Sequence, residues 1–185
     1  MAKLPVYGKK TVLTYVCLKS AAKNHLATAE SIEDGQLYSC MSSLVFSAFT
    51  LEAYLNHIGT ELFHDWENFE RDYSPRGKLD LICNKLELAP DFSALPYQSF
   101  DRVFKLRNLL AHGRTTEVSG SWKEHPAYEK KTIQLDSDWQ KECVPTIARR
   151  VYDDMVAIVN QIHKQAGHGD PPFTIASHGF AIKGE

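Results

Sequence analysis

Apolar residues recur with helical spacing along most of this chain, and this periodicity restricts its possible folds more than any other feature. The four long segments with apolar residues three or four positions apart are residues 11–33, 37–63, 97–112 and 138–165. Shorter segments of the same kind are residues 66–73 and 75–88. The sequence therefore predicts an all-α fold, an up-and-down bundle of four main helices with one or two short helices added.

Several residues mark where these helices should begin and end. Pro75 stands at an early position of its short helix, where a missing N–H group is tolerated. Gly113 follows the third long segment and is expected to be a left-handed stop. Ser137 and Gln140 have the spacing of a capping box before the last helix. Pro145 should either kink that helix or mark its true start.

The length of 185 residues is enough for one ordinary domain with its own core. We expect a single domain over residues 1–185, with the helical core at about 11–165. The Gly- and Pro-rich residues 167–185 should form an arm that packs on the core or frays. Residues 114–137 are polar and rich in turn formers, and residues 132–135 could form a short strand within them, although one strand does not make a sheet.

Composition and charge exclude some classes of function. The net charge of −2 does not demand the basic face of a duplex-binding protein, although it leaves room for a small cationic cleft. The four cysteines are far apart and form no C-x-x-C pair, which argues against a zinc ribbon or a redox dithiol. We expect free thiols in a reducing compartment, and no cofactor.

No segment reads as a targeting or membrane-spanning sequence. Residues 1–10 lack the apolar core and cleavage site of a signal peptide. The most apolar stretch, residues 42–63, is interrupted by Glu52, Asn56 and His57, so it reads as a core helix. We therefore expect a soluble cytoplasmic protein with no membrane partner.

An arginine stands where the helical pattern expects an apolar residue. On a wheel of about 100° per residue, Arg107 falls near the middle of the apolar arc of its helix. A guanidinium in such a stripe is costly unless a carboxylate or a phosphate pairs with it. In segment 37–63, Glu52 and Asn56 also fall in an apolar arc, one turn apart. We expect Glu52, together with Asn56, to neutralise and orient Arg107.

Two further polar residues, Asn108 and His112, lie one turn apart at the edge of the same arc. His112 is in the last turn of its helix, where the helix dipole favours an imidazolium. An imidazole beside a guanidinium suits acid–base chemistry on a phosphodiester, since His can move the proton and Arg can stabilise phosphoryl charge. RNA supplies its own nucleophile, the 2′-hydroxyl, so no metal is needed. One His offers an acid or a base but not both, and a two-fold dimer would supply the second.

The run Arg107-Asn108-Leu109-Leu110-Ala111-His112 resembles the R-x4-6-H signature of HEPN domains, in the form where Asn follows Arg. Residues 49–58 of the preceding long helix also look like the second core helix of such proteins. HEPN domains are helical bundles that commonly form dimers through the motif helices. Many are metal-independent ribonucleases of toxin–antitoxin, phage-defence and RNA-processing systems.

The resemblance implies that Arg107 and His112 are the catalytic pair and that Asn108 assists them. It implies a homodimer, an RNA substrate and, in toxin–antitoxin systems, an antitoxin protein as partner. Family members that have lost catalysis act as nucleotide-binding or protein-interaction modules, and this is the alternative function. Arg107 could also be purely structural, or the motif could be a coincidence on helices that do not pack together.

Two other features of the sequence, a histidine-containing helix face and an aromatic residue, could suggest binding sites but have simpler structural explanations. His57, Glu61 and His64 share a helix face and could mimic a metal site, but three weakly placed ligands argue against one. Trp66 could stack against a base, although such an aromatic residue more often caps the end of a bundle.

Overall fold

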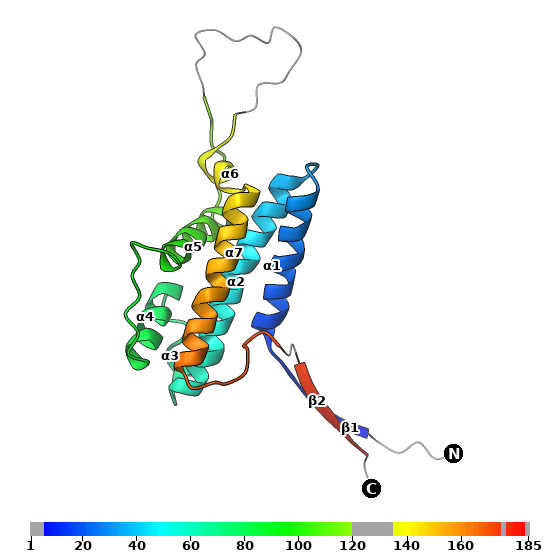
Figure 1. Cartoon of the computed structure of the whole chain (residues 1–185), viewed down its shortest axis with the longest axis vertical. Helices are drawn as coiled ribbons and strands as arrows, with labels where there is room; N and C mark the ends of the chain where they lie inside the picture. Colours follow the sequence, from blue (N-terminus) through cyan, green and yellow to red (C-terminus); the bar gives the residue numbers. More distant parts are fainter. Residues whose placement is uncertain (1–5, 120–134, 175–176, 184–185) are drawn as a thin grey trace, which may run out of the picture.

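The longest and most apolar helix, α2, forms the centre of the fold. The computed structural model describes residues 6–119, 135–174 and 177–183. The helices that pack against α2 (Gln36–Leu62) are α1 (Thr14–Ser31), α3 (Trp66–Phe69), α4 (Pro75–Lys85), α5 (Tyr97–Ala111) and α7 (Pro145–Gln165). In Figure 1, α1, α2 and α7 run side by side, and α5 crosses them at an angle.

The prediction of an all-α bundle is confirmed. The four long helices α1, α2, α5 and α7 correspond to the four predicted long segments, and α3 and α4 to the two short ones. The last predicted segment, 138–165, contains two helices, the short α6 (Asp138–Glu142) and α7. The apolar faces of the four long helices share one core, which includes Leu51 and Leu55 of α2 and Met155 and Ile158 of α7, each 1% exposed or less. Helix α2, although polar residues interrupt its apolar sequence, is thus a core helix, as predicted. No helix within the described ranges is long and apolar enough to cross a membrane.

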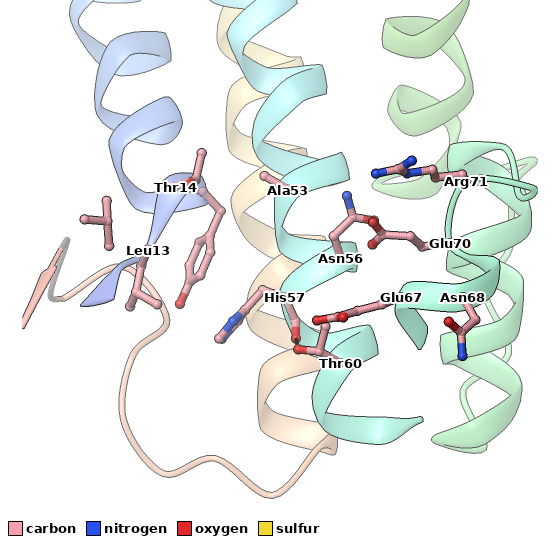
Figure 2. A pocket seen from close by; sticks show the side chains of 12 residues that line it. Leu13, Thr14, Ala53, Asn56, His57, Thr60, Glu67, Asn68, Glu70 and Arg71 are labelled. Carbon is pink, nitrogen blue, oxygen red and sulfur yellow. Dashed lines mark hydrogen bonds between the residues drawn. The ribbon is translucent and has the colours of Figure 1, made fainter. Parts of the chain in front are cut away.

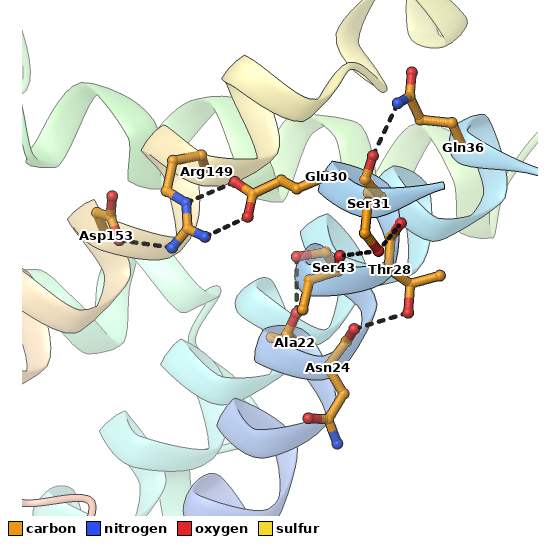
Figure 3. A network of polar contacts seen from close by, with 11 residues as sticks. Ala22, Asn24, Thr28, Glu30, Ser31, Gln36, Ser43, Arg149 and Asp153 are labelled. Atoms are coloured by element: carbon orange, nitrogen blue, oxygen red, sulfur yellow. Dashed lines mark hydrogen bonds and ion pairs between the residues drawn. The ribbon is translucent and has the colours of Figure 1, made fainter. Parts of the chain in front are cut away.

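Polar contacts fix how α1 sits against its two neighbours (Figure 3). The buried hydroxyl of Ser43 on α2 donates a hydrogen bond to the carbonyl of Ala22 on α1 at 3.0 Å. On the surface, the guanidinium of Arg149 on α7 donates two hydrogen bonds to Glu30 of α1, at 2.8 and 2.5 Å. The buried bond satisfies a hydroxyl that would otherwise be costly inside the core, and the exposed ion pair adds little stability.

The two ends of the described chain form a small antiparallel ribbon that projects from the bundle (Figure 1). Strand β1 (Val6–Val12) pairs with strand β2 (Ser177–Lys183) over all seven positions. The first helix therefore begins at Thr14, and the prediction of helix from residue 11 was wrong by three residues. The expected arm at 167–185 contains β2. The strand suggested at 132–135 lies outside the described residues except for its last position, which has no regular structure.

The predicted starts of the later helices are confirmed. Pro75 is the first residue of α4. A capping box precedes α6, in which the backbone N–H of Ser137 donates to the side-chain oxygen of Gln140 at 2.8 Å. Pro145 is the first residue of α7, so it separates α6 from α7 and does not kink one long helix. The cysteines are free, and three of the four are buried.

Candidate active site at the end of α5

Helix α5 carries the R-x4-6-H motif and is held by an apolar face directed into the core. Phe100, Val103, Phe104 and Leu106 are each 7% exposed or less. Helix α5 packs against both α2 and α7 through this face. The two predicted helices, residues 37–63 and 97–112, therefore pack against each other. A coincidental motif on helices that do not pack together would have predicted no such contact.

Arg107 points from α5 toward α2 and forms an ion pair there. Its Nη2–H donates a hydrogen bond to Oε2 of Glu52, as the wheel analysis predicted. Its Nη1–H donates to Oδ1 of Asn108 at 2.9 Å. The guanidinium carbon also lies 5.4 Å from the ring centre of Phe104 and 6.0 Å from that of Phe49. The side chains of Arg107 and Glu52 are only 22% and 28% exposed, so the pair is held firmly in a partly buried setting.

One donor of Arg107 remains unsatisfied. Its Nε–H is buried and has no hydrogen-bond partner among the described residues. A buried donor without a partner is uncommon in a folded protein, and it marks a strained or functional position or one that a bound group completes. The carboxylate of Glu52 thus anchors one edge of the guanidinium without satisfying all of it.

Asn56 does not contact Arg107, so the prediction that it helps to orient this residue was wrong. Its Oδ1 accepts a hydrogen bond from Nζ of Lys78 on α4 at 2.7 Å. Lys78 is only 5% exposed, and a buried ammonium requires an acceptor. Glu52 therefore contacts α5, whereas Asn56, one turn further along α2, contacts α4.

His112 caps α5 and is exposed. Its backbone N–H donates to the carbonyl of Asn108 at 3.0 Å, while its imidazole has no hydrogen bond or ion pair within the described ranges. The prediction that Gly113 is a left-handed stop was wrong, because Gly35 and Gly167 are the only described glycines with positive φ. The helix closes through His112 and through the Gly113 N–H, which donates to the carbonyl of Leu110 at 3.4 Å.

The motif does not place its arginine and histidine on the same side of one helix. Five positions at about 100° each separate Arg107 from His112 by about 140° around the axis. The guanidinium faces α2, and the imidazole extends from the helix end into solvent. Asn108 lies between them, because it accepts from Arg107 and precedes His112 by one turn. A single copy of the protein thus has a series of contacts from Glu52 through Arg107 to Asn108. The imidazole of His112 lies one turn beyond Asn108.

The histidines on α2 do not form a metal site. His57 Nε2 lies 3.3 Å from Glu61 Oε1, and His64 is exposed beyond the end of the helix. No group of three potential ligands that could hold a metal ion occurs in the part of the chain that the structure describes. Glu61 instead contacts His168 at 2.9 Å, a residue that the sequence analysis did not connect with it.

A polar cavity of about 540 Å³ lies on the side of α2 that faces the start of α1 and the turn around α3 (Figure 2). Asn56, His57 and Thr60 line it from α2, and Glu70 and Arg71 line it from the segment after α3. Arg107, Asn108 and His112 are not part of its wall. Sequence reasoning missed this cavity, because its walls come from three segments whose packing no local pattern reveals.

Comparison with known proteins adds no constraint: no protein-family model matches the chain, and no curated protein or solved structure is significantly similar to it.

Proposed function

We propose that this chain is a HEPN-like, metal-independent endoribonuclease that acts as a toxin or a phage-defence component. One observation supports this most strongly. Arg107 is anchored by Glu52 and Asn108 while one of its donors remains unsatisfied, and a free imidazole stands one turn further along the same helix. An anchored cation and an unengaged acid–base group, once both reach the same phosphate, are groups that metal-free cleavage of an RNA phosphodiester uses.

In the proposed reaction, the 2′-hydroxyl oxygen of the RNA attacks the adjacent phosphorus. A bond forms between O2′ and phosphorus, the bond from phosphorus to the leaving O5′ breaks, and the products are a 2′,3′-cyclic phosphate and a free 5′-hydroxyl. His112 takes the proton from O2′ or donates one to O5′, and Arg107 stabilises the charge on the phosphoryl oxygens. Asn108 assists by holding the guanidinium through its Oδ1.

A second acid–base group is needed, and we propose that a second copy of the chain supplies it. In a two-fold dimer, His112 of one subunit would face the Arg107 and His112 of its partner across a shared cleft. This arrangement would also overcome the angle of about 140° that separates the two side chains within one helix. An antitoxin protein that covers this cleft would be the natural inhibitor in a toxin–antitoxin setting.

The alternative is a non-catalytic HEPN-like module that binds a nucleotide or a protein. The close ion pair between Arg107 and Glu52 favours this reading, since a guanidinium bound to a carboxylate can be purely structural. The exposure of His112 fits the catalytic role, because an RNA substrate can reach its imidazole. The two readings differ in whether RNA is cut.

The test is cleavage of a mixed-sequence RNA by the purified chain in excess EDTA, at near-equimolar protein and RNA. We expect cleavage by the natural sequence and its loss in His112→Ala, with the thermal unfolding midpoint unchanged because the side chain is exposed. His64→Ala is the matched control, since His64 is also exposed and lies beyond the end of α2. RNA left intact by the natural chain, or cut equally well by His112→Ala, would favour the non-catalytic module.

A further inference from the structure

One stripe of α5 leads along the helix surface to His112. Residues 98, 102, 105, 109 and 112 follow one another at intervals of four or three positions, so they fall within an arc of about 80°. The exposed residues on this stripe are Gln98, Lys105, Leu109 and His112, and Arg102 is half-buried. The stripe lies away from Arg107, and it faces α6 and the first turns of α7.

Two hollows lie along this stripe and share part of their walls. One, of about 360 Å³, is bounded by Leu95, Gln98 and Arg150. The other, of about 220 Å³, is bounded by Leu109 and by Trp139 of α6. Arg102 and Lys105 line both hollows, so the two form one groove along α5, and we call it the α5 groove. One end of the groove is at Leu109, three residues before His112.

The carboxylates in the wall of the α5 groove are already engaged. Asp101 accepts two hydrogen bonds from Arg76, at 3.0 and 2.9 Å, and Glu142 is paired with Arg102. Asp138 accepts from Lys141 at 2.9 Å.

Two cations in the same wall are not neutralised. Lys105 and Arg150 have no ion pair or hydrogen bond from their side chains within the described ranges. The nearby carboxylate of Asp154 accepts a hydrogen bond from the hydroxyl of Ser99 at 2.5 Å. Within the described residues, the α5 groove thus has two cations without a salt bridge, Lys105 and Arg150, beside carboxylates that each have a hydrogen-bond partner.

Apolar surfaces flank these charges. Leu95 and Leu109 are each 51% exposed, at opposite ends of the groove, and the indole of Trp139 is half-buried between α6 and the stripe. Cations flanked by apolar and aromatic surfaces in one groove are the combination by which proteins hold single-stranded nucleic acid. The cations contact phosphates, and the flat surfaces contact bases.

We propose that the α5 groove binds the single-stranded RNA that flanks the cleaved bond and guides it to His112, with Lys105 and Arg150 as the phosphate contacts. This inference rests on the proposed ribonuclease function. It assigns a binding role to residues outside the motif, and it gives a function to two cations that have no salt bridge within the described ranges.

The test measures binding of a fluorescein-labelled, unstructured 12-nucleotide RNA to the full chain carrying His112→Ala, which keeps the RNA intact. Adding Lys105→Glu and Arg150→Glu should weaken binding at least about tenfold at 0.1 M salt. It should also reduce the dependence of log affinity on log salt by about 1.4, because each lost phosphate contact removes about 0.7 for a single strand. The matched control adds Lys85→Glu and Lys164→Glu, two exposed lysines at the ends of α4 and α7, with the same change in charge.

Equal affinity of the groove variant and the control would overturn the inference, and so would failure of the His112→Ala chain to bind the RNA. Cleavage separates this outcome from failure of the proposed function. If the chain with natural His112 cuts RNA and the groove substitutions leave KM unchanged, the function stands and the groove is not its RNA path. If they raise KM and leave kcat near its original value, both stand. A groove that binds an acidic protein and no RNA would also refute the proposal.

Discussion

Removal of Glu52 should destabilise the bundle and release Arg107. The carboxylate is the anchor of a guanidinium that also contacts Asn108 and has one buried donor without a partner. In Glu52→Ala, the guanidinium keeps only Asn108, in a setting where its side chain is 22% exposed. A partly buried cation without its carboxylate is costly, because the desolvation is no longer offset by the ion pair.

The magnitude follows from the burial of the pair. Exposed ion pairs contribute about 0.2–1 kcal/mol, and loss of one partner from a fully buried pair costs about 3–5 kcal/mol. With side chains 22% and 28% exposed, Arg107 and Glu52 lie between these limits, and we expect a coupling energy of about 2 kcal/mol. If Glu52→Ala loses about 2 kcal/mol of stability, its unfolding midpoint falls by about 4–8 °C for a chain of this size.

The assay is a double-mutant cycle. The free energies of unfolding in urea are measured for the natural chain, Glu52→Ala, Arg107→Ala and the double variant. The matched control is the same cycle on Glu30 and Arg149, whose side chains are 36% and 45% exposed, and there we expect less than about 1 kcal/mol. A coupling between Glu52 and Arg107 no larger than that of the control pair would refute the view that the core side of α5 is anchored by this contact.

Two further predictions concern parts of the bundle away from the motif. Gly59→Ala should destabilise the chain by about 1–3 kcal/mol or more in urea unfolding, because a Cβ at this position would lie 2.2 Å from the buried ring of Trp66; an unchanged midpoint would contradict that packing. Burial lowers the pKa of His163 below its ordinary value of 6.5, helped by the nearby His168, so the unfolded chain binds more protons than the folded one just below pH 6.5. The free energy of unfolding should therefore fall as the pH drops below about 6.5. In unfolding curves recorded from pH 7.5 to 5, His163→Gln should reduce this dependence on pH. If the free energy of unfolding depends on pH to the same extent in the variant, His163 is not the source of the dependence.

Much of the helical architecture could be predicted because it depends on local signals. The period of apolar residues located the four long helices, and the capping pattern of Ser137 and Gln140 located the start of α6. The pairing of Arg107 with Glu52 could also be predicted, since a charge in an apolar arc on each of two neighbouring helices leaves few other partners. These predictions needed only one helix, or two helices in contact.

The remaining features depend on contacts between segments that are distant in the sequence. Strand β1 forms because β2 returns to it from the other end of the described chain, and no local pattern announces that pairing. The helical wheel places Asn56 beside Glu52 and so predicts that it contacts Arg107, but the oxygen of Asn56 accepts a hydrogen bond from the buried Lys78 of α4. Gly113 lacks the left-handed conformation because the helix already closes through the backbone of His112.

The most direct test of the proposed chemistry is the identity of the RNA ends that the chain produces in excess EDTA. The substrate is an oligonucleotide with a single cleavable linkage, compared with the same oligonucleotide carrying a 2′-deoxy sugar at that position. Attack by the 2′-hydroxyl with His112 as acid or base predicts a 2′,3′-cyclic phosphate, a 5′-hydroxyl and no cleavage of the deoxy substrate. Cleavage of the deoxy substrate, or products that carry a 5′-phosphate, would contradict the proposed roles of His112 and Arg107.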